Sequence, residues 1–513
     1  MKPQAVAQGK GNRPLRILFA AAECHPFEKS SGIADVTSGL PRELAALGHE
    51  VEIFIPLYLK ALLYPVLHDL PIYRARDFPP VKVRLGPYLY RSRIYSTRLP
   101  DSTVKVHLVD ADTFQYFTAK SALASHRSLE DTFSRFAFFS KVIATIAARR
   151  RERPDVVHAH DWPAGLVPLL LTTQFYWTGI ASVFTVHNVR QSEGVSPEVF
   201  YRLTRQRESR HPGLYGWAGR GLLHEGRMDL LKAGLVRADV VTTVSPSHAE
   251  ELQREEYGGS YAPTLRWIAA QGGLRGILNG LDPSWLPARS PAELLADRPT
   301  NKAELQRLFD LPVDPTALLA IMTSRLTASK GYPLLPEALG RLRREGYNIQ
   351  LGIASEGENG LLEHLLDQDS PQLPVRHRPW GDEPWHRLLY SGADLLLMPS
   401  HEEPCGLGQL AAQAYGTPPL VHATGGLRDT VGDEETGFVF HRYHAWDFAD
   451  AIARAHRLFR EEPAAWRALQ ERIMGLDHSW RASAQEYVEL YRLAQRRAAR
   501  ADRYAPLPPV PVE

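Results

Sequence analysis

The chain of 513 residues is 44% hydrophobic and 23% charged, as expected for a globular protein of two or three domains. Its formal net charge of +2 gives no electrostatic case for nucleic acid or an anionic membrane. Cys24 and Cys405 are its two cysteines, too few for a disulfide framework, and no segment has the roughly 18 consecutive apolar residues of a membrane helix. With no signal-peptide pattern at the N-terminus, the sequence predicts a soluble, cytoplasmic protein.

The first half of the chain alternates apolar runs with helical spacing. Short apolar runs predict strands at 15–22, 51–55, 155–160, 182–186 and 239–244. Residues 131–149 form a strongly amphipathic helical pattern, and 73–110 alternate in polarity as β-rich elaboration at a sheet edge would. Strands that alternate with helices are typical of an α/β protein with a parallel sheet.

The second half repeats this pattern and predicts a second α/β domain. Apolar runs predict strands at 318–324, 351–354, 395–398 and 418–421. Asn301 and Lys302 are expected to open the first helix of this domain. The polar stretch 1–13 and the Pro-rich stretch 498–513 are expected to be disordered.

Residues 391–431 contain two strand–loop–helix units in succession. The first loop carries Glu402, Glu403, Cys405 and Gly406, and the second carries Gly425 and Gly426. Open α/β sheets bind ligands at the carboxyl ends of their strands, where helix N-termini offer N–H groups to phosphates. A purely structural turn explains the two glycines about as well, but it does not explain two adjacent carboxylates in the first loop.

These motifs resemble those of bacterial glycogen synthases and plant starch synthases. The family's Glu-Pro-Cys-Gly-Leu loop is matched by residues 403–407, its Tyr-Gly-Thr by 415–417, and its Thr-Gly-Gly-Leu-X-Asp-Thr-Val by 424–431. The resemblance covers roughly residues 15–492 and is densest in the second domain. It implies a retaining glucosyltransferase of the GT-B fold: α/β, with two Rossmann-like domains facing each other across a cleft.

The resemblance also implies a domain organisation, in which a C-terminal helix crosses back to the first domain. In chain order we expect a disordered tail (1–13), an acceptor-side Rossmann-like domain (14–280), a linker (281–287), a nucleotide-sugar Rossmann-like domain (288–478), a terminal helix that returns to the first domain (479–497) and a disordered tail (498–513).

A loop with basic side chains follows the first predicted strand of each domain. Lys29 and Gly32 come after 15–22, and Arg325 and Lys330 come after 318–324. Backbone N–H groups and an ammonium can cradle a diphosphate, and an arginine adds a forked donor. The alternative is ordinary solvated surface cations. Both loops resemble family motifs, Lys-X-Gly-Gly-Leu-X-Asp-Val and Ser-Arg-Leu-Thr-X-X-Lys-Gly, which favours diphosphate binding.

Polar side chains also follow two further strands of the first domain. Asp161 follows 155–160, in a match to the family's His-Ala-His-Asp-Trp, and could bind sugar hydroxyls or simply cap a helix. His187 and Asn188 follow 182–186, and His187 could equally be a buried structural residue. The resemblance places this His-Asn pair under the donor sugar.

The resemblance implies further contacts with the donor nucleotide-glucose, all from loops at strand ends or near the linker. These donor-binding residues are Asp35, Asn279, Trp380, Cys405, Gly406, Leu407, Thr424, Gly425 and Gly426. Trp380 aligns with an aromatic residue that stacks on the base, although core packing is an alternative.

The reaction implied is transfer of glucose from ADP-glucose to an α-1,4-glucan such as glycogen, with retention of configuration. Arg325, Lys330 and Lys29 would neutralise the leaving diphosphate, while His187 and Glu403 would hold the sugar. The acceptor would enter along Asp161 and the loop at 190–193. Because no Asp-X-Asp motif stands at the donor loop, we expect no metal and no other cofactor.

Several positions depart from the family pattern, and they leave two other functions open. The departures are Ser31 for glycine, Pro163 for histidine, a longer charged loop at 190–193, Asp229 for asparagine, and His401 and Glu402 in the donor loop. A non-catalytic glucan- or nucleotide-sugar-binding descendant, or a related retaining transferase with another donor or acceptor, are the alternatives. The choice between ADP-glucose and UDP-glucose, the acceptor's chain length and the oligomeric state are left open.

Overall fold

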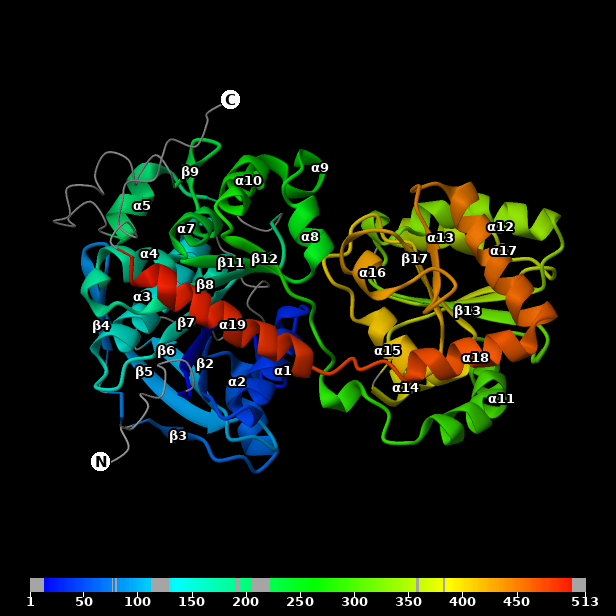
Figure 1. The fold of residues 1–513 in the computed structure, drawn as a ribbon, viewed down its shortest axis with the longest axis horizontal. Helices are drawn as coiled ribbons and strands as arrows, with labels where there is room; N and C mark the ends of the chain where they lie inside the picture. Colours follow the sequence, from blue (N-terminus) through cyan, green and yellow to red (C-terminus); the bar gives the residue numbers. More distant parts are fainter. Residues whose placement is uncertain are drawn as a thin grey trace, which may run out of the picture. The chain divides into compact units, whose positions relative to one another are not determined.

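A computed structural model describes residues 13–75, 77–78, 81–111, 129–189, 194–204, 222–356, 359–381 and 383–500 (Figure 1). By internal contacts the chain divides into two compact units. The first unit comprises 1–243, 252–277 and 481–513, and the second comprises 244–251 and 278–480. Most of the two tails expected to be disordered lies outside the described residues, as does the loop at 190–193.

The first unit is built on a ten-stranded sheet in the order β12-β11-β8-β7-β1-β2-β6-β5-β3, with β4 paired to β5. Strands β12 to β6 run parallel, whereas β3, β4 and β5 are antiparallel and lie at one edge. The strands are β1 (Arg16–Ala20), β2 (Glu50–Pro56), β3 (Tyr73–Arg74), β4 (Val81–Leu85), β5 (Tyr88–Arg98), β6 (Lys105–Ala111), β7 (Val156–His160), β8 (Ala181–Val186), β11 (Val240–Thr243) and β12 (Leu274–Gly276). A separate ribbon joins β9 (Leu223–His224) and β10 (Arg227–Met228).

The predicted strands of this unit are confirmed, including the β-rich edge. One detail differs: β6, the last strand of the predicted edge region, pairs in parallel with β2 inside the sheet. Every residue of β7 and β8 is buried, because helices cover both faces of the parallel part. The continuous apolar runs in the sequence reflect this double burial.

The helices of the first unit include the amphipathic helix expected at 131–149. They are α1 (Ile33–Ala46), α2 (Leu59–Leu67), α3 (Leu129–Arg149), α4 (Leu166–Thr173), α5 (Pro197–Thr204), α7 (Leu230–Arg237), α9 (Glu255–Gly258), α10 (Ala262–Ala270) and α19 (Arg481–Ala498). Helix α19 is the terminal helix, and it packs against α1 and β8, while its buried Tyr487 and Tyr491 rings lie beside His158 of β7 (Figure 1). The terminal helix therefore returns to the first unit, as the resemblance implies.

The second unit has a six-stranded parallel sheet in the order β15-β14-β13-β16-β17-β18. Its strands are β13 (Leu318–Thr323), β14 (Ile349–Ala354), β15 (Val375–Arg378), β16 (Leu395–Met398), β17 (Pro419–His422) and β18 (Phe438–Phe440). Its helices are α8 (Pro246–Glu251), α11 (Pro291–Leu308), α12 (Leu335–Arg344), α13 (Asn359–Leu366), α14 (Glu383–Gly392), α15 (Gly408–Ala414), α16 (Gly425–Thr430), α17 (Ala445–Glu461) and α18 (Pro463–Met474). Successive residues of β13 belong to two separate apolar clusters, for example Ala320 to one and Ile321 to the other, so both faces of the sheet are covered.

The prediction that Asn301 and Lys302 open a helix is wrong. Helix α11 begins ten residues earlier, at Pro291, and it runs through Pro299. Ser290 and Glu293 form a capping box: the Ser290 N–H donates to Glu293 Oε2 at 2.9 Å, and the Glu293 N–H donates to Ser290 Oγ at 3.4 Å. The capping box and the proline in the first turn mark the start of the helix, which continues through Pro299 and buries Leu294, Leu295 and Leu305.

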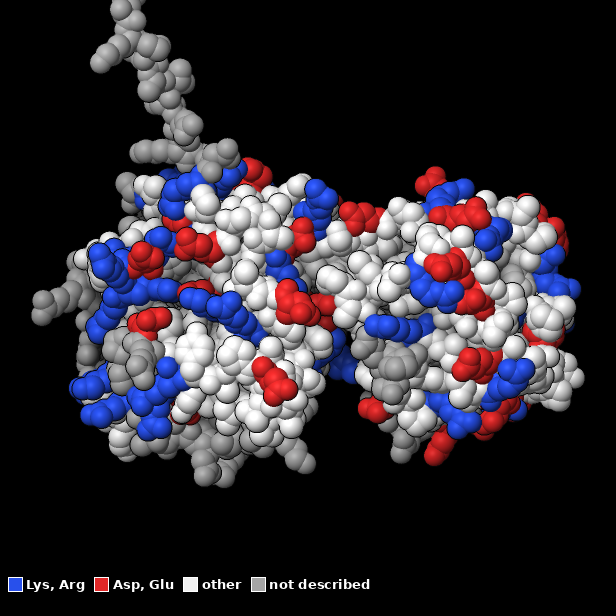
Figure 2. Space-filling model, turned by 90° about the horizontal axis from the view of Figure 1, so that it is seen from below, with Lys and Arg blue, Asp and Glu red and all other residues white. Residues whose placement is uncertain are grey.

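Acidic and basic side chains are distributed differently over the two units. Figure 2 shows a band of basic side chains with acidic groups beside it on the viewed face of the first unit, and a mixture of both signs on the second. No helix within the described part of the chain is long and apolar enough to span a membrane.

The order of the strands reverses once in each sheet, beside its first strand. In the first unit the chain runs from β1 outward through β2 and returns to the other side of β1 with β7. In the second unit it runs from β13 through β14 to β15 and returns beside β13 with β16. Such a reversal leaves a crevice at the carboxyl ends of the two adjacent strands, which is where open α/β sheets bind ligands.

Candidate functional site

The loop after β1 is held by a buried carboxylate. Glu23 accepts hydrogen bonds from the backbone N–H groups of Ser30 and Ser31, each at 2.9 Å, and from the Ser30 hydroxyl at 2.6 Å. Ser31 is not among the described residues with positive φ, and a Cβ added to Gly32 would meet nothing within 4 Å. The serine that replaces the family's glycine is therefore accommodated without backbone strain.

Lys29 and Asp35, both predicted to contact the donor, form an ion pair. The Lys29 Nζ lies 2.6 Å from Asp35 Oδ1, in the first turn of α1. The Lys29 side chain is 36% exposed and that of Asp35 is 8% exposed. The ion pair thus holds the Lys29 ammonium beside α1, while the lysine side chain as a whole is partly exposed.

Asp161, at the end of β7, adopts a strained backbone conformation. Its φ is 52° and its ψ is −179°, a region that residues other than glycine rarely occupy. Its buried carboxylate accepts from the backbone N–H groups of His187, at 2.7 Å, and Asn188. It makes no side-chain cap to the short helix that follows, so the helix-cap alternative is wrong.

Burial raises the pKa of Asp161 to about 7, although the two backbone hydrogen bonds work against that rise. The carboxyl group links the ends of β7 and β8, because it bonds the residues that follow β8. His187 and Asn188 are themselves half-buried rather than part of the core. The structure therefore brings together three predicted residues of the first unit: Asp161, His187 and Asn188.

A row of histidines connects this group to the interior of the first unit. His160 Nδ1 lies 3.1 Å from His187 Nε2, and the His160 and His158 rings lie 4.1 Å apart. His158 also bonds the Tyr491 hydroxyl at 2.9 Å and the Thr185 hydroxyl at 2.6 Å. Burial is the main cause that lowers the pKa values of His158 and His160 well below the ordinary value.

In the second unit, Lys330 and Glu403 meet at the crevice between β13 and β16. Lys330 Nζ lies 2.6 Å from Glu403 Oε2, which also accepts from the Ser400 hydroxyl at 3.2 Å. Gly331 has a φ of 85°, and a Cβ there would lie 1.9 Å from the Pro399 carbonyl oxygen. Only glycine allows this approach, which brings the loops after β13 and β16 together.

Arg325 is the exposed cation of the same crevice. It is the second residue after β13, and it has no ion-pair partner among the residues that the structure describes. Because no carboxylate among the described residues pairs with its guanidinium, it can supply a full positive charge to an anionic ligand.

The two adjacent glutamates have different partners. Glu403 bonds Lys330, whereas Glu402 Oε1 lies 3.7 Å from His401 Nδ1. The two neighbouring carboxylates thus have different ionisable partners. The Lys330 ammonium therefore distinguishes Glu403 from its neighbour.

Cys405 is a buried thiol rather than a nucleophile. Burial raises its pKa to about 12, against the effect of a hydrogen bond from the Asn279 backbone. Gly406 follows with a φ of 74°, and Leu407 precedes α15. Gln409 fixes this turn, since its Nε2 donates to the carbonyl oxygens of Cys405 and Gly406 at 3.0 and 3.1 Å.

Thr424, Gly425 and Gly426 use their donors within the protein. The Gly425 N–H and the Thr424 hydroxyl donate to Glu251 Oε1 at 2.8 and 3.2 Å, and the Gly426 N–H donates to the Glu403 carbonyl oxygen at 3.1 Å. A Cβ on Gly425 would lie 2.0 Å from the Glu403 carbonyl oxygen, and one on Gly426 would lie 2.3 Å from that of Cys405. The glycine pair thus lets the two loops pack together.

Helix α8 supplies several of these contacts to the second unit. Besides Glu251, the Ser245 hydroxyl just before the helix donates to the Pro404 carbonyl oxygen at 2.6 Å. Ser247 donates to the Asp429 carboxylate from its N–H, at 2.8 Å, and from its hydroxyl, at 2.5 Å. The segment therefore supports the loop that carries Glu403.

Two remaining predicted donor contacts, Trp380 and Asn279, lie in different surroundings. Trp380 is 38% exposed, with its ring edge-on to His386 at 6.4 Å, so core packing does not explain it. Asn279 is 9% exposed, and its Oδ1 has no hydrogen-bond partner among the described residues.

Two departures from the family pattern are accommodated by local hydrogen bonds. Asp229 caps α7 and accepts from the Tyr261 hydroxyl at 2.6 Å, so the charge is used structurally. Pro163 lies within the short helix Trp162–Ala164, and its carbonyl oxygen accepts from the Ser140 hydroxyl at 3.2 Å. The charged loop at 190–193 lies outside the described residues.

Sequence reasoning missed the groups that position the predicted residues. Glu23, His160, Glu251 and Ser400 each bond a predicted residue or its loop. Ser400 and Glu23 had a signal, since both follow predicted strands. Glu251 had none, because its partners lie 173 and 174 positions away.

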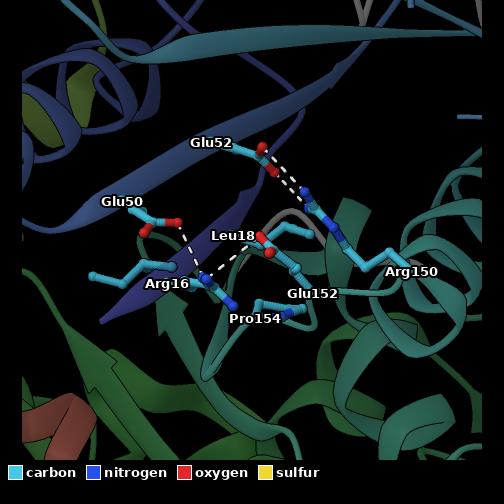
Figure 3. Close-up of a pocket in the computed structure, with 8 residues that line it drawn as sticks. Arg16, Leu18, Glu50, Glu52, Arg150, Glu152 and Pro154 are labelled. Carbon is cyan, nitrogen blue, oxygen red and sulfur yellow. Dashed lines mark hydrogen bonds and ion pairs between the residues drawn. The ribbon is translucent and has the colours of Figure 1, made fainter. Parts of the chain in front are cut away.

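Another pocket lies at the amino ends of β1 and β2, where none of the predicted residues lies. Its volume is about 50 Å³, and Figure 3 shows that its charged side chains point toward one another. Arg150 pairs with Glu52 at 2.6 Å, and Arg16 pairs with Glu50 at 3.0 Å and Glu152 at 3.4 Å. Every charged side chain of the pocket therefore has a partner of opposite sign, although the three carboxylates outnumber the two guanidinium groups.

Comparisons with known proteins agree with the fold and the motifs. Residues 16–267 match the starch synthase catalytic domain, and 306–467 match glycosyl transferases group 1. Glycogen synthase of Syntrophotalea carbinolica is 35% identical over 501 residues, with 94% of this chain and 99% of that protein covered. Glycogen synthase 1 of Methylococcus capsulatus is 36% identical over 504 residues, with 94% and 97% covered.

Solved structures give the same result. The catalytic domain of starch synthase IV from Arabidopsis thaliana, bound to ADP and acarbose, superposes with a TM-score of 0.78 at 26% identity, over 95% of this chain and all of that one. Sucrose-phosphate synthase from Thermosynechococcus elongatus has a TM-score of 0.54 at 20% identity, over 93% and 98%, which shows a shared fold. The chain therefore belongs to the glycogen and starch synthase family of GT-B glycosyltransferases.

Proposed function

We propose that this enzyme transfers glucose from ADP-glucose to the non-reducing end of an α-1,4-glucan, with retention of configuration. The observation that carries the proposal is the Lys330–Glu403 pair at the crevice of the second unit, beside the exposed Arg325. A starch synthase of the same fold binds ADP, which supports an adenine nucleotide as the leaving group.

The second unit supplies charge to this reaction. Arg325 and Lys330 stabilise the departing diphosphate, since forked and point-charge donors together match its oxygens. Glu403 holds the donor's hydroxyls and favours positive charge at the anomeric carbon. Trp380 stacks on the base, and the loop of Cys405, Gly406 and Leu407 lies next to the diphosphate.

The first unit supplies a further cation and groups that bind the sugars. Lys29, aimed by Asp35, adds positive charge near the diphosphate. His187 and Asn188 hold the donor glucose, and Asp161 orients acceptor or donor hydroxyls. The acceptor's proton passes to the leaving diphosphate on the same face, which retains the α configuration.

The reaction needs no metal in this proposal, because three cations already serve the diphosphate. Among the described residues, no group of three or more His, Cys, Asp or Glu side chains is placed to hold a metal ion. Both cysteines are buried and neither forms a disulfide, and this cysteine usage supports a cytoplasmic location.

The test is to incubate the purified enzyme with glycogen and either ADP-glucose or UDP-glucose, and to measure release of the nucleoside diphosphate. Release from ADP-glucose that depends on glycogen, unchanged by EDTA, is the expected result. Preferred use of UDP-glucose would overturn the donor assignment. Binding of glycogen without release from either donor would indicate a non-catalytic protein.

A further inference from the structure

His160 is joined directly to His187, which the proposed function places at the donor sugar. His160 is the last residue of β7, and His187 is the first residue after β8. The two strands pair in parallel with His160 opposite Thr185, which sets the imidazoles side by side. Their Nδ1 and Nε2 atoms lie 3.1 Å apart, so one nitrogen donates a proton and the other accepts it.

His160 has no other polar partner among the described residues. It is fully buried, with its ring stacked on Phe19 at 5.4 Å and an interplanar angle of 17°. On its Nε2 side no hydrogen-bond partner is found in the described part of the chain. Burial, together with nearby His158 and His187, lowers the pKa of His160 well below its ordinary value, so the ring is neutral and carries one N–H.

The position of that proton follows from the cost of burying an unpaired donor. If Nε2 carried the proton, its N–H would point into the core without an acceptor, at a cost of about 1–3 kcal/mol. If Nδ1 carries it, the N–H donates to His187 Nε2 and only a lone pair on Nε2 is left unpaired. Orphaned buried N–H groups are rarer than orphaned acceptors, so the second arrangement is favoured.

We propose that His160 is a positioning residue that holds His187 in the tautomer whose Nε2 carries no proton. His187 then has its single N–H at Nδ1 and acts there as a hydrogen-bond donor. The other tautomer of His187 would present an N–H to His160 and force the proton of His160 onto the unpartnered Nε2. Because the ring is already held in one tautomer, its N–H is in place to bind a sugar oxygen, and no tautomer has to be selected when the sugar binds.

This inference rests on the proposed function only for its effect on catalysis, because the tautomer is a property of the resting protein. His158 shows why His160 is the relevant residue. It lies on the same face of β7, is equally buried and also has a lowered pKa. Both of its nitrogens, however, face hydroxyl groups, of Tyr491 and Thr185, which can donate or accept. His158 therefore transmits no fixed tautomer.

The experiment measures the ring ¹⁵N chemical shifts of histidine-labelled enzyme without substrate, with His187 assigned from the signal lost in His187→Gln. The wild type is expected to show Nε2 of His187 unprotonated and Nδ1 protonated. In His160→Leu the His187 signal should move toward a mixture of tautomers, and kcat should fall about tenfold with little change in KM. In His160→Asn an amide N–H replaces the Nδ1 donor, and both the tautomer and kcat should recover in large part.

His158→Leu is the matched control, since it removes an imidazole of equal burial and should leave the His187 tautomer unchanged. A protonated Nε2 of His187 in the wild type would overturn the inference, even if His160→Leu failed to fold. An unchanged tautomer in a folded His160→Leu would overturn it too. If the wild type released no nucleotide from either donor, the proposed function would fail while the tautomer result still stood.

Discussion

The two units place their candidate groups at the same point of the same topology, but with opposite chemistry. In the first unit the crevice beside β1 is bordered by buried groups: His160 is 0% exposed and Asp161 is 3% exposed. In the second unit the crevice beside β13 has an ion pair whose side chains are 21% and 12% exposed, with the exposed Arg325 nearby. The sheet order decides where a ligand binds, and the loops decide whether the neighbouring side chains are mainly buried groups or exposed charges.

On the proposed function, this difference predicts separate roles for the two units in catalysis. Full charges act on the charge that develops on a leaving diphosphate, so their loss should change kcat strongly. Buried neutral groups act through geometry and protonation, so their loss should change orientation, pH dependence and stability. Four predictions test this division.

The largest effect is expected from the cations of the second unit. Arg325→Ala and Lys330→Ala should each lower kcat by about a hundredfold or more, because each removes a charge contact of the transition state. Turnover of ADP-glucose at saturating glycogen measures this. Arg344→Ala, an exposed arginine at the end of α12, should be silent as a control. Wild-type rates in either variant would show that the charged crevice does not serve the diphosphate.

The next effect distinguishes the two adjacent glutamates. Glu403→Gln should lower kcat by about tenfold or more, and by more than it weakens donor binding, because it removes the charge and keeps the shape. Glu402→Gln should be nearly silent, since its carboxylate lies by His401. Steady-state kinetics and calorimetric binding of ADP-glucose separate kcat from affinity. Equal impairment of both variants would mean that Lys330 does not mark the relevant carboxylate.

A smaller effect is expected on donor binding alone. Trp380→Leu should raise the KM for ADP-glucose about tenfold with little change in kcat, because base stacking contributes about 1–3 kcal/mol. Trp446→Leu is the control, because Trp446 is 48% exposed but packs against the Arg341 guanidinium at 4.6 Å. A changed kcat at unchanged KM would contradict a stacking role for Trp380.

The last prediction concerns the buried carboxyl group of the first unit. The pKa of Asp161 rises from 3.8 to about 7 on folding, so its contribution to stability is present below about pH 4 and is lost as pH rises through 7. Asp161→Asn cannot ionise and keeps an oxygen for the His187 N–H. Its stability relative to the wild type should therefore rise between pH 4 and pH 8, by at most about 4 kcal/mol.

Thermal melts of both proteins at pH 4, 6 and 8 measure this, and turnover should fall in the variant. A difference in Tm that does not change with pH would mean that folding does not raise the pKa of Asp161. Asp35→Asn is a useful comparison, since that buried carboxylate has a cationic partner in Lys29.

Much of the fold could be predicted because periodicity is a local signal. The strands before Asp161, His187 and Glu403 were readable as apolar runs, so these residues could be placed at strand ends. The start of helix α11 was misplaced because the capping box of Ser290 and Glu293 went unused. The hydrogen bond between His160 and His187 could not be predicted from the sequence. It depends on two strands being neighbours, which periodicity does not specify.

The position of α8 has a consequence for any attempt to dissect the protein. Val244–Glu251 belongs to the second unit, although the chain on both sides of it belongs to the first. A protein fragment that comprises only residues 278–480 would lack this segment. In that fragment the Gly425 N–H would lose its acceptor, Glu251. An orphaned buried donor costs about 1–3 kcal/mol, a large part of a typical domain's stability. The second unit is thus discontinuous in sequence, and exchanging it between relatives requires both of its segments to be exchanged together.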